Sequence, residues 1–151
     1  MQAQFDILRA TRENALKIAA DFSIEQLNKV PEGLNNNIIW NLGHMVVTQQ
    51  LLVYGLSKLP MNVPAEWVAK YRKGTKPEGD ISAEEYEQIK VAMLETIDQM
   101  QADFEKGIFK NFKTYPTSFG YTLNSAADAA AFNTVHEAMH LGNLILMKKM
   151  V

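Results

Sequence analysis

The segment from Ala131 to Asn143 reads A-F-N-T-V-H-E-A-M-H-L-G-N and contains two of the three histidines of the chain, His136 and His140. It lies within a long uninterrupted run of helix-forming residues. Positions i and i+4 of an α-helix share one face, one turn apart, so the two imidazoles can point at one place. The third histidine, His44, lies in another apolar helical pattern. We therefore predict that the three histidines bind one divalent metal ion.

This segment belongs to one of four stretches that have the three-four apolar spacing of amphipathic helices. We expect helices over residues 3–22, 37–56, 82–107 and from 124 or 125 to the end. The second is apolar on so much of its circumference that it must be central in a bundle or part of a dimer interface. Asn37 and Ser82 stand where N-cap residues are favoured.

Residues 57–81 form a long connection that contains Pro60, Pro64 and Pro77, with a short helix expected over residues 65–71. A connection of this length indicates a crossover rather than a tight turn. Short links would make the first and last helix pairs antiparallel, and the long link would make the second and third helices parallel. The prediction is an all-α fold, a four-helix bundle forming a single domain over residues 1–151.

Composition excludes several classes of protein. A net charge of −2 provides no strong field for nucleic acid or anionic lipid. Without cysteine there is no disulfide, no thiolate zinc site and no thiol for covalent chemistry. The most apolar stretch, residues 38–56, is too polar for a membrane helix, and the N-terminus lacks the features of a signal peptide. We therefore expect a cytoplasmic protein with no nucleic-acid or membrane partner.

Two features leave alternatives open. Arg12 interrupts the apolar stripe of the first helix, and a snorkelling arginine with its stem on the core is favoured over a ligand-binding role. The segment from Phe109 to Tyr121 is rich in aromatic residues. It either packs on the core or lines the mouth of a pocket.

A His-x-x-x-His pair also occurs by chance in unrelated helices, so its context carries the argument. All three histidines lie among apolar neighbours, where an imidazole needs a polar partner.

The segment also matches the H-E-x-x-H pattern of metalloproteases, but no ligand follows His140. Glu137 points about 100° around the helix from His136. We interpret Glu137 as a supporting or surface residue rather than as a catalytic base.

Together, W-N-L-G-H at residues 40–44 and H-E-A-M-H-L-G-N at residues 136–143 resemble the DinB/YfiT-like superfamily. The resemblance covers essentially the whole chain. It implies an up-down-down-up bundle, a divalent metal, often zinc or nickel, on His44, His136 and His140, and frequent homodimers. Relatives often have Gln at the position of Asn143. Asn143 is three residues from His140, and we predict a supporting hydrogen bond there.

The resemblance implies function less specifically. Characterised relatives include thiol S-transferases and isomerases that use low-molecular-weight thiols, and this suggests a transferase in which the metal lowers the pKa of a small thiol. One alternative is a hydrolase that activates water at the same site. The other is a metal-binding bundle without turnover. The sequence identifies no catalytic residue.

Overall fold

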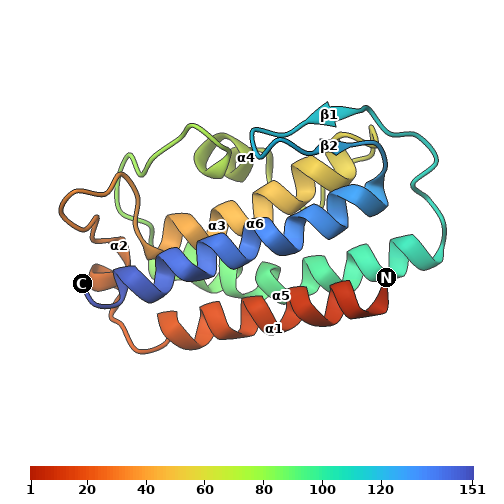
Figure 1. The fold of residues 1–151 in the computed structure, drawn as a ribbon. Coiled ribbons are helices and arrows are strands. Elements are labelled where there is room, and N and C mark those ends of the chain that lie inside the picture. Colours follow the sequence, from red (N-terminus) through yellow and green to blue (C-terminus); the bar gives the residue numbers. More distant parts are fainter.

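The computed structural model describes residues 1–151, and its regular structure consists of helices and one two-stranded hairpin (Figure 1). The long helices are α1 (Gln2–Ala19), α3 (Ile38–Gln50), α5 (Ala83–Glu105) and α6 (Ala126–Met147). A π-helical turn, η1 (Leu51–Gly55), continues α3. The fold is therefore all-α apart from the hairpin, as the sequence predicts. No helix is both long and apolar enough to cross a membrane.

The long helices lie side by side. Helix α1 contacts α5 and α6, and α3 contacts the same two helices. In Figure 1, α1 and α6 run in one direction and α3 and α5 run in the other. Because α3 and α5 are parallel, the chain must return along the molecule between them. The long connection after η1 makes this return, and it contains α4 (Ala65–Tyr71).

The remaining elements are short. Helix α2 (Ile24–Asn28) begins with a capping box between Ser23 and Gln26. Strands β1 (Tyr115–Pro116) and β2 (Thr122–Leu123) pair antiparallel, and the sequence pattern did not indicate this hairpin. Figure 1 shows the hairpin and α4 on the same side of the molecule, above α3 and α6.

The structure confirms the predicted N-caps Asn37 and Ser82 and adds Ser125 at the start of α6. Asn37, Ser82 and Ser125 each accept a hydrogen bond from the backbone nitrogen three residues further on. The C-terminal ends of the helices differ more from the predicted positions than the N-terminal ends do. Helix α1 ends at Ala19 rather than Phe22, because residues 20–22 form the turn that brings Ser23 into position to cap α2. Helix α6 ends at Met147, four residues before the end of the chain.

The core has two apolar clusters separated by a layer of buried polar side chains. One cluster of 17 residues surrounds Trp40, Met45 and Leu144, and one of 10 surrounds Phe5, Tyr54 and the small residues at the start of α6. Between them along the helices lie Arg12, Gln49, Gln50, Thr96, Asn133 and Glu137. These polar groups need partners inside the protein because they are removed from water.

Candidate metal centre

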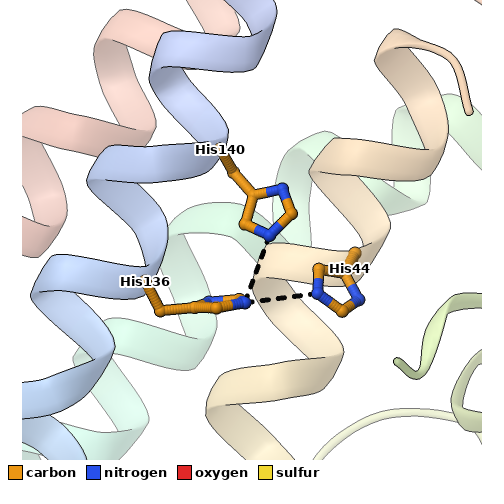
Figure 2. Close-up of side chains that lie close together, drawn as sticks. All are labelled: His44, His136 and His140. Atoms are coloured by element: carbon orange, nitrogen blue, oxygen red, sulfur yellow. Dashed lines mark hydrogen bonds between the residues drawn. The ribbon is translucent and has the colours of Figure 1, made fainter. Parts of the chain in front are cut away.

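The three histidines meet between α3 and α6 (Figure 2). His136 Nε2 lies 3.2 Å from His44 Nε2 and 3.2 Å from His140 Nε2. One ligand nitrogen from each ring lies within 4.8 Å of the other two. The structure therefore brings together the residues that the sequence proposed as ligands, with one nitrogen of each ring turned toward a common centre.

Hydrogen bonds on the outer side of two rings determine where their protons lie. His44 Nδ1 is 2.6 Å from the carbonyl oxygen of Tyr71, which can only accept, so Nδ1 carries the proton. His140 Nδ1 is 2.8 Å from Asn41 Oδ1. The Asn41 amide nitrogen donates to Asn36 and to the carbonyl of Asn37, and this leaves its oxygen facing His140. His44 and His140 therefore direct unprotonated Nε2 lone pairs at the centre.

His136 differs from the other two because its Nδ1 is buried and has no hydrogen-bond partner. Without a cation, the most favourable position for its proton is Nε2, where it can bond to one of the two bare nitrogens nearby. To bind a metal ion through Nε2, the neutral His136 ring would carry its proton on Nδ1 instead. Three neutral imidazoles with their Nε2 atoms facing inward form a donor set that suits a divalent transition metal.

Burial keeps the rings neutral. The pKa of His136 is lowered to about 2, first by burial and then by the neighbouring His140, His44, Arg12 and Lys73. The pKa of His140 is lowered to about 4 by burial together with His44. The pKa of His44 is lowered by burial too, against the opposing effect of the Tyr71 carbonyl. Near neutral pH the three rings are therefore uncharged: Nε2 of His44 and of His140 presents a lone pair to a metal ion, and Nε2 of His136 does so once its proton lies on Nδ1.

The W-N-L-G-H segment has a structural role at nearly every position. The Trp40 ring stacks on the His44 ring at a centroid distance of 4.6 Å and an angle of 12°. Gly43 allows the Tyr71 ring to approach α3, since a Cβ at position 43 would lie 2.7 Å from that ring. This close approach of α4 brings the Tyr71 carbonyl to His44. Together with Asn41, these residues orient two of the three imidazoles.

A cavity of about 660 Å³ opens beside the histidines. All three line it, and its remaining walls come from η1, the hairpin segment, α6 and Lys73. Its apolar lining includes Leu52, Leu56, Phe119 and Phe132. The centre is therefore accessible from one side, and a π-helical turn forms part of the wall, as such turns often do at functional sites.

The aromatic segment takes both roles that the sequence left open. Phe109 and Phe112 pack against the second core cluster. Tyr115 and Phe119 line the cavity beside the histidines. Tyr121 is exposed.

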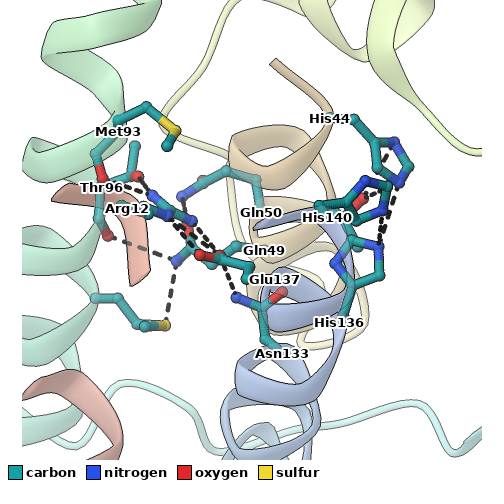
Figure 3. Close-up of polar contacts among 12 residues, drawn as sticks. Arg12, His44, Gln49, Gln50, Met93, Thr96, Asn133, His136, Glu137 and His140 are labelled. Carbon is teal, nitrogen blue, oxygen red and sulfur yellow. Dashed lines mark hydrogen bonds and ion pairs between the residues drawn. The ribbon is translucent and has the colours of Figure 1, made fainter. Parts of the chain in front are cut away.

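Arg12 and Glu137 form a fully buried ion pair (Figure 3). Arg12 donates to both carboxylate oxygens at 2.7 and 2.9 Å, and also to the Met93 carbonyl and the Thr96 hydroxyl. Asn133 donates to the same carboxylate at 2.7 Å. The snorkelling interpretation of Arg12 is therefore wrong, because the whole side chain lies in the core. The amphipathic pattern of one helix cannot reveal a partner 125 residues away.

The roles of the supporting residues also change. Glu137 is buried rather than exposed, and its carboxylate is bound by Arg12 and Asn133 instead of a histidine. Asn143 is exposed and makes no side-chain hydrogen bond, so it does not support His140. Asn41 does so from the facing helix. The signal for Asn41 was an amide three residues before His44, between the apolar residues Trp40 and Leu42.

Comparisons with known proteins agree with this geometry. A model of the DinB superfamily matches residues 7–144. A search of the curated proteins finds no match. A crystal structure described as the conserved protein of a locus from Enterococcus faecalis has a similar fold, with a TM-score of 0.62 and 13% sequence identity, and the match covers 99% of this chain and 95% of that one. The family match includes both histidine-bearing helices, and the chain belongs to the DinB superfamily.

Proposed function

We propose that this protein binds one divalent metal ion, zinc or nickel, through Nε2 of His44, His136 and His140, and that it is a transferase acting with a low-molecular-weight thiol. The observation that carries the proposal is the convergence of three neutral imidazole nitrogens on one point that opens into a cavity. Three protein ligands leave a position open, as in catalytic rather than structural zinc sites. When bound, such an ion acts as a Lewis acid and lowers the pKa of a coordinated donor.

The residues around the centre would orient the histidines and exclude water. Asn41 and the Tyr71 carbonyl fix the rotation and the protonation of two rings. The leucine and phenylalanine walls of the cavity favour an apolar substrate part and keep the reacting groups away from water. Because the chain has no cysteine, the thiol has to come from a second molecule.

The same cavity favours a transferase over the hydrolase alternative. No aspartate or glutamate lines it, and the nearby Glu137 is bound by Arg12. A hydrolase that activates water would gain from a carboxylate or a free histidine as general base, and this cavity presents neither. The non-catalytic alternative is disfavoured because the histidine centre adjoins an accessible cavity instead of being sealed in the core.

A thiol-conjugation assay tests this proposal. We expect metal-dependent transfer of bacillithiol, mycothiol or glutathione to a fluorogenic electrophile, with loss of turnover in His140→Ala and normal turnover in Asn143→Ala, whose side chain is exposed. The comparison is made with metal-loaded and chelator-treated protein. Absence of metal-dependent turnover with every thiol would argue against a transferase, and ester or amide turnover without thiol would favour the hydrolase.

We also propose that the long helices form an up-down-down-up four-helix bundle that makes a single domain. The helix directions in Figure 1 and the contacts of α1 and α3 with both α5 and α6 support this arrangement. The long connection between α3 and α5 supports it as well, because parallel neighbours need a crossover.

A homodimer through the outer face of α6 completes the proposal. Val135, Met139, Ile145 and Leu146 are each more than 40% exposed on this face. Gly142 lies among them, with open space where a Cβ would stand. An uncharged apolar face with a central glycine is compatible with a second copy of itself in an isologous pair, because no like charges would meet.

The α6 face makes a direct prediction about assembly. Leu146→Glu would place two like charges in the proposed interface, so we expect the dimer to dissociate to monomers without loss of helix content. Light scattering coupled to size-exclusion chromatography measures the mass, and Lys148→Glu is the exposed control beyond the helix. A native protein that is monomeric at micromolar concentration would exclude this interface.

A further inference from the structure

The lining of the cavity beside the histidines includes a positively charged side chain and no negatively charged one. Lys73 is the one lysine among its lining residues, and no arginine, aspartate or glutamate takes part. A divalent ion would add two further positive charges. A ligand that fills the cavity therefore compensates this charge only if it carries negative charge itself.

The ammonium group of Lys73 is available for such a ligand. Lys73 Nζ donates to Ser118 Oγ at 2.9 Å, a neutral partner in the turn of the hairpin. None of the ion pairs of the chain includes Lys73. An ammonium group has three donors, so two remain after the Ser118 bond.

The segment that carries Lys73 is anchored to the centre. Tyr71, two residues earlier, is buried against Gly43, and its carbonyl accepts from His44. The bond to Ser118 connects the same segment to the hairpin. The backbone before Lys73 is thus anchored by Tyr71, and its exposed ammonium group is held by one bond to Ser118, which reduces the entropy lost when it binds a ligand.

We propose that the cavity binds a small organic carboxylate with an apolar body, with its carboxylate on the Lys73 ammonium and the Ser118 hydroxyl. The apolar body lies among Leu52, Leu56 and Phe132, and its other end approaches the histidine centre. One ammonium and one hydroxyl match a single negative charge. The inference rests on the proposed function for what happens at the histidines, but the carboxylate site itself needs no metal.

The test compares two ligands of the same shape and different charge. 3-Phenylpropanoate and 3-phenylpropanamide are titrated into the metal-free and the zinc-loaded protein, and binding is followed by amide chemical shifts in NMR spectra. We expect the native protein to bind the acid about tenfold more tightly than the amide in both forms, the factor typical of a hydrogen bond to a charged group. Lys73→Met should remove this preference, and Lys73→Arg should retain it.

Lys76→Met is the matched control. It removes the same charge from the same connection, but Lys76 lines a different cavity beside Trp40 and Asp80. Equal binding of acid and amide by the native protein, or a preference that survives in Lys73→Met, would overturn the inference. If zinc does not bind and the Lys73-dependent preference persists, the inference stands and the proposed function fails. If zinc binds and the protein shows no preference for the acid, the carboxylate inference fails and the proposed metal site is retained.

Discussion

Replacing Glu137 by leucine is expected to lower the free energy of unfolding by about 3–5 kcal/mol, the usual cost of leaving one partner of a buried ion pair without the other. Arg12 and Glu137 are both 0% exposed, so the guanidinium would remain in the core without a counter-charge. Urea unfolding followed by far-UV circular dichroism measures the change.

Two controls separate the pair from its surroundings. The double variant Arg12→Met, Glu137→Leu should recover most of the lost stability, because no buried charge then remains. Glu87→Leu, which breaks an exposed pair with Lys90, should change stability by no more than about 1 kcal/mol. A loss below 1 kcal/mol for Glu137→Leu would contradict the burial of this pair.

The ion pair also affects the candidate site. It ties α6 to α1 directly and to α5 through Met93 and Thr96. Glu137 follows His136 in the sequence, so the bonds to Glu137 hold the rotation of α6 about its axis. We infer that this network keeps His136 and His140 directed toward α3.

The second large effect is expected in metal affinity. His136→Ala and His140→Ala each remove a proposed ligand, and the affinity for zinc should fall by more than the 10- to 100-fold that loss of a supporting hydrogen bond typically costs. Asn41→Ala removes only the bond to His140 Nδ1 and should fall within about that 10- to 100-fold range. Asn143→Ala should leave the affinity unchanged. Competition titration with a chromophoric chelator measures all four variants.

The order of these effects distinguishes the roles of the residues. A large loss in Asn143→Ala, with none in Asn41→Ala, would show that the support of His140 has been assigned to the wrong asparagine. Native affinity in both histidine variants would remove these residues from the ligand set altogether.

The helices, two of their N-caps and the histidine pair could be predicted from the sequence, because they depend on residues close together in the chain. The apolar spacing indicated the long helices, and the side-chain oxygens of Asn37 and Ser82 marked two of the helix starts. The pairing of His136 with His140 follows from helix geometry alone. The approach of His44 follows from burying the apolar faces of two helices against each other, so its place near the pair was also foreseeable.

The features that sequence reasoning missed depend on contacts between distant segments. The partner of Arg12 lies on α6, and nothing near Arg12 in the chain identifies it. The spacing of Asn143 suggested that it supports His140, whereas Asn41 reaches His140 only through the packing of α3 on α6. The β1–β2 hairpin has two residues in each strand, too few for a periodic signal.

The most direct test of the central claim, that three histidines hold one metal ion, is elemental analysis of the protein purified without a histidine tag. We expect one divalent ion per chain in the native protein, with none retained after gel filtration in a variant in which His44, His136 and His140 are all alanine. A native protein that remains metal-free after incubation with zinc and nickel salts, or a triple variant that retains one ion per chain, would contradict it.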